Sequence, residues 1–369
     1  MNKMSRRTFI RTSAAAGAVI IAGVTDINKL VFAQNKVTLV NSIRSLANPY
    51  HAVWNRGGRL FAESVGANYV TLTTEGNSEK GIADIKAIIA KTGGNMVLNV
   101  DPNNAPDALP IVQACIEAKA FVVTQWNKPD DLHPWDNNPY YVAHISFPGV
   151  KYGSAIADSL FDAMGGSGGI VALGGLPANI PAIERKQGLD DSLKKNSKIQ
   201  LLDFQIAEWQ RGKAFDTMNT WLTKFGDQIK GVWAANDDMG LGALEALRAA
   251  KLAGKVPVVG IDGVDEAVKS VLAGEFAATT VWDPFWQGGM GLSIGYHAKM
   301  GKFDPAKEPK EHREMYGTGI LINAKNAKEF YEKNILDVPR IDWEDLWGRA
   351  SGQIQYAGAM ATQAATKAP

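Results

Sequence analysis

Short apolar runs alternate with segments of helical period along most of this chain. The first series of runs is Val37–Val40, Tyr69–Leu72, Met96–Val100, Phe121–Thr124 and Tyr140–Ile145. A second series follows at Ile170–Leu173, Ile199–Phe204, Val232–Ala235, Val256–Ile261 and Ala277–Val281. Strands that alternate with helices are typical of parallel sheets covered by helices. The pattern therefore predicts an α/β fold with two doubly wound units of similar size.

The stretch from Lys230 to Gly263 shows the repeating unit most clearly. Between its two strands, one apolar helical stripe comprises Met239, Ala243, Leu244, Leu247 and Ala250. A strand-helix-strand of this length forms a right-handed crossover in a parallel sheet. The strands lead into Asn236 and Asp262, and ligands of such sheets bind at the carboxyl ends of strands. For this turn alone, a helix N-cap is the simpler interpretation of Asn236 or Asp237.

Polar and aromatic residues recur at the ends of the other predicted strands. The candidate ligand-binding residues are Asn48, Tyr50, His51, Trp126, Asn127, Arg185, Trp209, Asn236, Asp262 and Trp282. One aromatic residue in a turn is more often a lid on the core, but several beside amides, acids and arginine favour a ligand cleft. Sugars and polyols suit such a cleft, because their C–H faces stack on rings while their hydroxyls bond to carboxylates, amides and guanidinium groups.

The first 33 residues have the pattern of an export signal. Residues 5–10 (SRRTFI) match a twin-arginine motif, and an apolar run from Ala14 to Val24 follows. That run is too short and too rich in alanine and glycine for a membrane span. Residues 31–33 favour cleavage after Ala33, and no cysteine directly follows the apolar run. We therefore expect a soluble periplasmic protein and not a lipoprotein, whether Arg6 and Arg7 form a twin-arginine motif or an ordinary basic region.

Charge and cysteine content bear on the class of protein. Removing residues 1–33 leaves 336 residues, which suits two domains, and changes the formal net charge from +1 to −3. A weakly acidic chain without long basic runs gives no support to nucleic-acid or membrane binding. The single cysteine, Cys115, lies in an apolar helical pattern, so we expect a buried and unreactive thiol.

The sequence gives little support to catalysis or to metal and cofactor binding. Residues 165–169 (GGSGG) match a nucleophile elbow, but they precede a strand, whereas an elbow joins a strand to a following helix. The five histidines lack metal-ligand spacing, and no phosphate-loop or calcium-loop motif is present. We expect no enzyme activity, no metal and no cofactor, and we interpret His51 as a residue that bonds to a ligand.

The most specific pieces of the sequence resemble the periplasmic sugar-binding proteins of ABC importers, in the ribose-binding-protein-like group. The pieces are Asn48–Tyr50, Trp233–Leu244, Val258–Gly263 and Ala278–Trp282, within a resemblance from about Val37 to Ile335. It implies the type I periplasmic binding protein fold, with two Rossmann-like lobes and a three-crossing hinge. The expected boundaries are 36–145 plus 284–318 for the N-terminal lobe, 146–283 plus 319–336 for the C-terminal lobe, and 337–369 for a C-terminal extension.

The resemblance also implies roles for single residues. In the family, the equivalents of Asn236 and Asp262 bind sugar hydroxyls, and aromatic residues corresponding to Tyr50 and Trp209 stack on the sugar ring. Arg185 matches an arginine near the start of the helix after the fifth strand.

This chain departs from ribose binders at two points. Trp126-Asn127 stands where those proteins have an Asp-Arg pair, and Trp282 stands where they have an amide. We therefore expect a more aromatic and less charged pocket, for which ribose itself is not a safe assignment. The segment after Ile335 has no counterpart in compact members of the group. We expect its Trp343 and Trp347 to dock on the protein surface, and the end from about Met360 to be disordered.

The function that these features favour is capture of a monosaccharide or polyol and its delivery to an ABC permease in the inner membrane, by a monomeric protein. A sensory protein that presents its ligand to a chemoreceptor or sensor kinase would have the same sequence features. An exported enzyme is a further alternative, because the twin-arginine route often carries folded, cofactor-loaded enzymes. Repressors of the same fold need an N-terminal pair of DNA-binding helices, and here an export signal occupies that place.

Overall fold

The computed structural model describes residues 36–336 and 340–350. The predicted export signal at residues 1–33 and the tail from Met360 therefore lie outside the described residues. Among the helices of the described ranges, none combines the length and apolar character needed to cross a membrane.

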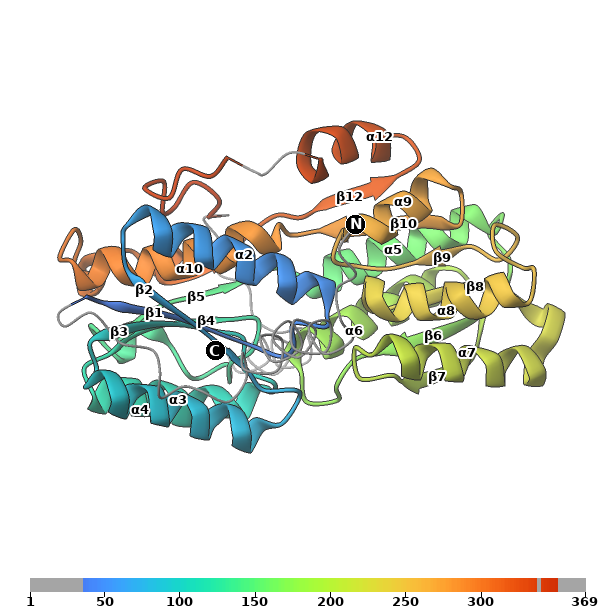
Figure 1. Ribbon diagram of the computed structural model, residues 1–369. Coiled ribbons are helices and arrows are strands. Elements are labelled where there is room, and N and C mark those ends of the chain that lie inside the picture. Colours follow the sequence, from blue (N-terminus) through green and yellow to red (C-terminus); the bar gives the residue numbers. More distant parts are fainter. Residues whose placement is uncertain (1–35, 337–339, 351–369) are drawn as a thin grey trace, which may run out of the picture. The chain divides into compact units, whose positions relative to one another are not determined.

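Two six-stranded sheets form the framework (Figure 1). The first sheet has the strand order β11-β5-β4-β3-β1-β2 and the second has β12-β10-β9-β8-β6-β7. The strands are β1 (Thr38–Ile43), β2 (Asn68–Thr73), β3 (Met96–Val100), β4 (Phe121–Gln125), β5 (Tyr141–Ser146), β6 (Gly168–Gly174), β7 (Ile199–Ile206), β8 (Ile229–Ala234), β9 (Val258–Val259), β10 (Phe276–Val281), β11 (Glu314–Tyr316) and β12 (Ile320–Asn323). All pairs are parallel except the antiparallel pair of β10 and β12. Each predicted apolar run overlaps one of these strands, which confirms the predicted α/β fold with two doubly wound units.

Three strands differ from expectation. The predicted strand Val256–Ile261 shortens to β9. Gly260, directly after it, lies close to the start of the preceding helix, so that an added Cβ would lie 2.3 Å from Asp237 Oδ1. The ladder resumes as a single bridge between Asp262 and Val281. Strands β11 and β12 were not predicted, because three and four residues are too few to show a period.

Helices connect the strands and cover the sheets. The longer ones are α2 (Pro49–Ser64), α3 (Ser78–Thr92), α4 (Ala108–Glu117), α5 (Gly149–Ala163), α6 (Ile180–Lys195), α7 (Arg211–Phe225), α8 (Asp237–Ala249), α9 (Asp265–Leu272) and α10 (Pro284–Lys299). Helices α2 and α10 lie on one face of the first sheet and α3 and α4 on the other (Figure 1). Among the helices that belong to the second sheet, α5 packs on α6, and α7 packs on α8. We name each sheet with its helices the first lobe and the second lobe.

The chain passes between the lobes three times. Phe147–Pro148 joins β5 to α5, Trp282–Asp283 joins β10 to α10, and Gly317–Gly319 joins β11 to β12. These short connections are the predicted three-crossing hinge.

Glycines allow α10 to pack closely on α2. A Cβ added at Gly57 would lie 1.9 Å from the carbonyl oxygen of Phe285, and one added at Gly288 would lie 1.9 Å from that of Trp54. Two neighbouring amides of the sheet, Asn99 and Gln125, donate hydrogen bonds to the carbonyl oxygen of Gln287. The start of α10, directly after the second crossing, is thereby fixed to the first lobe.

The segment 340–350 packs on the first lobe. The ring of Trp343 contacts Phe61, and its carbonyl oxygen accepts a hydrogen bond of 2.6 Å from Ser293 Oγ. Trp347 stacks on His312 with ring centroids 4.4 Å apart. Both tryptophans therefore dock on the surface, as predicted.

Candidate functional site

A partly open cavity lies where the carboxyl ends of the strands of the two sheets meet, and the space within it, counted with the adjoining solvent, is about 380 Å³. The predicted site residues that line it are Asn48, Tyr50, His51, Trp126, Asn127, Arg185, Trp209, Asn236 and Asp262. Four further residues line it that we did not predict, namely Arg44, Asp101, Asn179 and Pro181. Trp282 is the predicted residue that is not part of the lining.

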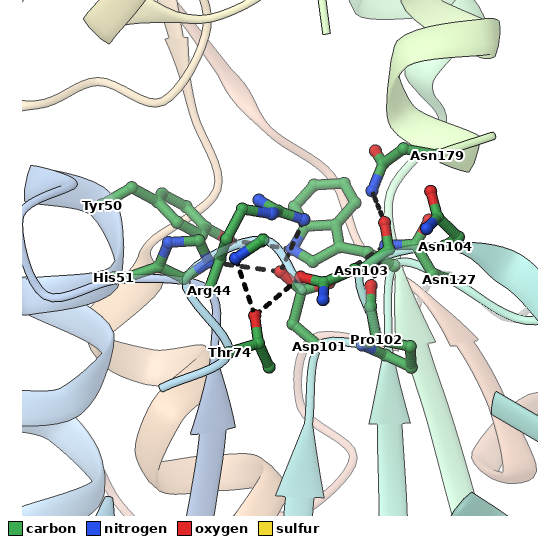
Figure 2. Close-up of polar contacts among 12 residues, drawn as sticks. Arg44, Tyr50, His51, Thr74, Asp101, Pro102, Asn103, Asn104, Asn127 and Asn179 are labelled. Carbon is green, nitrogen blue, oxygen red and sulfur yellow. Dashed lines mark hydrogen bonds and ion pairs between the residues drawn. The ribbon is translucent and has the colours of Figure 1, made fainter. Parts of the chain in front are cut away.

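On the first lobe's side, side chains converge on the carboxylate of Asp101 (Figure 2). His51 Nε2 lies 3.2 Å from Oδ2 and Asn127 Nδ2 donates to Oδ1 at 3.0 Å, while Arg44 Nη2 lies 3.8 Å from Oδ2. A carboxylate only accepts, so His51 carries its proton on Nε2. Burial lowers the pKa of His51, although the bond to Asp101 opposes this, and keeps the ring neutral. Its buried Nδ1 is then an acceptor, without a partner in the described part of the chain.

The hydroxyl of Tyr50 is already occupied by protein groups. It donates a short hydrogen bond to Gln287 Oε1 and accepts one of 3.0 Å from Trp126 Nε1. Burial raises the pKa of Tyr50 well above its usual value, so the hydroxyl keeps its proton. Its ring, more than its hydroxyl, is therefore available to a ligand.

On the second lobe's side, Arg185 is surrounded by indole rings. Its guanidinium carbon lies 5.5 Å from the ring centroid of Trp126, 5.4 Å from that of Trp209 and 4.8 Å from that of Trp282. Nη1 donates to the carbonyl oxygen of Ala235 at 2.7 Å. The buried Nε has no partner among the described residues. Planar guanidinium groups stack well on aromatic faces, so the rings hold this donor in place.

Trp282, predicted as a wall of the cavity, lies in the hinge instead. It belongs to the second crossing, stacks on Phe147 of the first crossing with centroids 5.4 Å apart, and touches Gly319 of the third. Trp126 and Arg185, which do line the cavity, pack against it. Because it follows a strand, Trp282 fitted the strand-end pattern, but the sequence could not distinguish a hinge core from a cavity wall.

Asn236 caps a helix and also lines the cavity. Its Oδ1 accepts from the backbone N–H of Met239 at 3.0 Å, which caps α8. Its Nδ2 points to the carboxylate of Asp262 at 3.4 Å, beside the cavity. Asp237, by contrast, is a structural residue, because its oxygens accept from Thr279 Oγ1 at 2.6 Å and from the N–H of Val264 at 3.0 Å.

Asp262 is an almost buried carboxyl. Burial raises its pKa well above the usual value, although the positive charge of Arg185 opposes this. Burial likewise raises the pKa of Asp237, to about 7. A ligand hydroxyl that donates to Asp262 would favour the ionised form, so binding and ionisation of this carboxyl are coupled.

Three residues of the cavity have backbone angles that side chains of their size rarely adopt. The φ angles are 64° for Trp126, 63° for Trp209 and 142° for Asp262. Such conformations cost about 1–3 kcal/mol each and cluster at ligand-binding positions. The fold is thus strained where it presents these side chains.

Two of the residues that we missed obey the rule that found the others. Asp101 directly follows β3, and Arg44 directly follows β1. Asn179 and Pro181 flank the start of α6. Their sequence is that of an ordinary helix N-terminus, and it does not show that these residues line a cavity.

The described residues contain no group of three histidine, cysteine, aspartate or glutamate side chains placed to hold a metal ion. Cys115 is free and buried, and burial raises the pKa of its thiol to about 12. A buried thiol with a raised pKa forms little thiolate, so this environment agrees with the predicted low reactivity of Cys115.

Comparisons with known proteins agree with the fold. A family model described as the periplasmic binding protein domain matches residues 39–302. The ribose import binding protein of Salmonella typhimurium is 28% identical over 302 residues, which cover 81% of this chain and 96% of that protein. The xylitol-binding protein of Mycolicibacterium smegmatis is 37% identical over 156 residues, and the match covers 42% of this chain and only 44% of that protein.

A solved structure is more similar still. It is described as a twin-arginine translocation pathway signal protein from Burkholderia phytofirmans, is 55% identical and has a TM-score of 0.85. The match covers 87% of this chain and 99% of that one. The family model spans most of both lobes, and the chain therefore belongs to the periplasmic binding protein domain family.

Proposed function

We propose that this chain is the extracytoplasmic solute-binding protein of an ABC transporter. It captures a neutral monosaccharide or polyol in the cavity between the lobes and delivers it to a permease in the inner membrane. The observation that carries the proposal is the set of buried polar atoms around the cavity that no described residue satisfies, beside aromatic rings.

These atoms match the chemistry of hydroxyl groups. Arg44 Nε, Arg185 Nε and Trp209 Nε1 are donors without a partner in residues 36–336 and 340–350, and His51 Nδ1 is an acceptor. A hydroxyl donates one hydrogen bond and accepts up to two, so a ligand with several hydroxyls can serve both kinds of atom. Each buried polar atom left unpaired costs about 1–3 kcal/mol, which selects against ligands that lack these groups. Relatives whose names specify ribose and xylitol support the same class of ligand.

The ligand would be bound between two lobes that move on the hinge. We propose residues 36–145 with 284–318 as one lobe and 146–283 with 319–336 as the other. Closure about short hinge crossings, with the ligand between the lobes, is a common motion of two-lobed binding proteins. In this proposal the protein binds its ligand without chemical change and is not an enzyme.

We also propose that residues 1–33 direct export by the twin-arginine route and are removed. The support is the SRRTFI motif at residues 5–10 and the name of the 55% identical relative. Replacing Arg6 and Arg7 with lysine should stop export of this chain, as measured by cell fractionation. Export at an unchanged level would contradict this route.

A thermal-shift screen tests the proposed function. D-ribose, D-allose, xylitol and myo-inositol would be compared with amino acids and small organic acids, since a ligand of the native state raises the melting temperature. We expect at least one sugar or polyol to do so and to bind with 1:1 stoichiometry in calorimetry. A shift given only by acids or amino acids would contradict the proposal.

A further inference from the structure

Asn127 uses its side chain to join the two lobes. The residue is fully buried, and its Nδ2 donates to Asp101 Oδ1 at 3.0 Å and to the carbonyl oxygen of Pro102 at 2.9 Å. Its Oδ1 accepts a hydrogen bond of 2.9 Å from the backbone N–H of Ile180. Ile180 is the first residue of α6, so this bond crosses from the first lobe to the second. Both donors of Asn127 are in use, which leaves one lone pair for any other partner.

Asn179 makes the reciprocal connection. It occupies the N-cap position of α6, where asparagine usually accepts a hydrogen bond from the first turn of its own helix. Here it makes no such bond, and its Nδ2 donates instead to the carbonyl oxygen of Asn103 in the first lobe at 2.9 Å (Figure 2). Asn127 accepts the hydrogen bond from the N–H of Ile180, in the first turn of α6, where the side chain of Asn179 makes no capping bond. The N-terminus of α6 is therefore capped by a residue of the opposite lobe.

The same contacts connect to the cavity. Asp101, which accepts from Asn127 through Oδ1, faces His51 through Oδ2, and His51 lines the cavity. On the other side, α6 carries Arg185. Asn127 therefore contacts both parts of the site. Through Ile180 it fixes the start of the helix that carries Arg185, and through Asp101 it fixes the carboxylate that orients His51.

We propose that Asn127 and Asn179 form a latch between the lobes: they stabilise the closed cleft directly and are positioning residues for Arg185, not ligand contacts. This proposal depends on the proposed function in one respect, namely that the cavity is the place where a ligand binds. Its bonds join protein to protein, so its effect on closure is measurable without any ligand.

The test is a distance measurement between the lobes in ligand-free protein. Spin labels are placed at cysteines that replace Ala87 in α3 and Thr220 in α7, both exposed. Cys115 is buried and, with its pKa raised to about 12, does not compete for the label. Distance distributions are recorded for the wild-type sequence and for the variants Asn127→Ala and Asn179→Ala. The matched control is Asn104→Ala, because Asn104 bonds within its own lobe, to Ser78 Oγ at 3.2 Å.

We expect a closed population in the wild-type sequence, and a ratio of closed to open molecules about five- to tenfold lower in each latch variant. The Asn104→Ala distribution should match the wild type. A wild-type protein that is wholly open without ligand, or latch variants with unchanged distributions, would overturn the latch. Because Asn179→Ala removes a single inter-lobe bond from the other side, the test does not depend on how well Asn127→Ala folds.

A second measurement separates the latch from direct ligand contact. With xylitol and D-ribose as probes, latch variants should raise the dissociation rate about five- to tenfold and change the association rate little, since closure follows encounter. Loss of affinity in Asn127→Ala together with an unchanged ligand-free distance distribution would make Asn127 a ligand contact and overturn the proposal. If neither probe binds, the proposed function is in question, while the ligand-free distances still decide the latch.

Discussion

The first lobe builds its side of the cavity around one shared carboxylate, whereas the second lobe builds its side around the guanidinium of Arg185, which rings of both lobes and of the hinge enclose. His51, Asn127 and Arg44 all approach one carboxylate, that of Asp101. Each of these groups limits the orientation of the others. A change at one position on this side should therefore spread to its neighbours.

On the second lobe's side, aromatic rings and unusual backbone conformations fix the groups that line the cavity. Arg185 is enclosed by indole rings, and Trp209 and Asp262 are presented by backbone with φ angles of 63° and 142°. This side also contains the carboxyl of Asp262, whose pKa burial raises well above the usual value. We therefore expect the first lobe to orient its groups through Asp101, and the second lobe to supply the strongest individual ligand contact through Asp262.

Substitution of the hinge tryptophan tests whether the rings behind Arg185 serve stability or binding. Trp282→Ala should lower the free energy of unfolding by about 3–5 kcal/mol, because a buried ring packed between the three crossings is lost. Urea denaturation measures this. Trp343→Ala, at the half-buried ring of the segment 340–350, is the control and should cost less. Unchanged stability with lost affinity would restore Trp282 as a cavity wall.

The carboxyl of Asp262 tests where the strongest ligand contact lies. Asp262→Ala should weaken binding of the best sugar or polyol by about 1.5–3 kcal/mol, the value of a hydrogen bond to a charged group. Calorimetry measures the affinity. The neighbouring Asp238→Ala, which removes a carboxyl outside the cavity lining, should leave affinity unchanged. Equal affinities for both variants would mean that Asp262 does not contact the ligand.

Much of this site could be predicted from sequence, because one rule covers most of it. In parallel sheets the residue after a strand lies at the ligand-binding edge. That rule located Asn236 and Asp262, and applied evenly it would also have located Asp101. It would have missed Arg44, because the predicted strand ended at Val40 whereas β1 extends to Ile43. It failed for Trp282, since the same position after a strand is also where the chain crosses to the other lobe.

Pairing between lobes could not be predicted in the same way. Asn127 was expected to face the ligand because it follows β4, but its partner Ile180 lies 53 residues away and on the other lobe. Asn179 has the local sequence of a helix cap, and only the approach of Asn103 shows that its amide is used elsewhere. Periodicity and capping signals describe segments, whereas these bonds depend on how two folded units meet.

Trp209 tests whether the ring that the second lobe contributes acts through its face or through its polar edge. Trp209→Phe keeps an aromatic ring but removes Nε1, which has no partner in the described part of the chain. We expect affinity to fall by about 0.5–1.5 kcal/mol, the net value of one hydrogen bond. Trp209→Ala should cost more and also reduce the change of intrinsic fluorescence on binding. If Trp209→Phe binds as tightly as the wild type, the ring acts by stacking alone.

The last prediction concerns the network of the first lobe and its response to pH. Burial lowers the pKa of His51 below the value of about 6.5 that an unfolded chain has. The folded state therefore binds this proton less tightly than the unfolded state. As pH falls below about 6.5, the unfolded state gains the proton first, and the stability of the folded protein decreases. Above that pH the contribution is fully present.

The comparison with His51→Gln isolates this effect, because glutamine does not titrate and distant groups titrate equally in both proteins. We expect the free energy of unfolding of the wild type to fall relative to that of the variant between pH 7 and pH 5, by at most about 1.4 kcal/mol per pH unit. Urea denaturation at a series of pH values measures the difference. A constant difference over this range would mean that the bond to Asp101 offsets burial completely, and that His51 can become charged in the folded protein. In that case the first lobe would present a cation to the cavity at pH 5, and its network would no longer be the neutral set of hydrogen-bonding groups that a sugar or polyol suits.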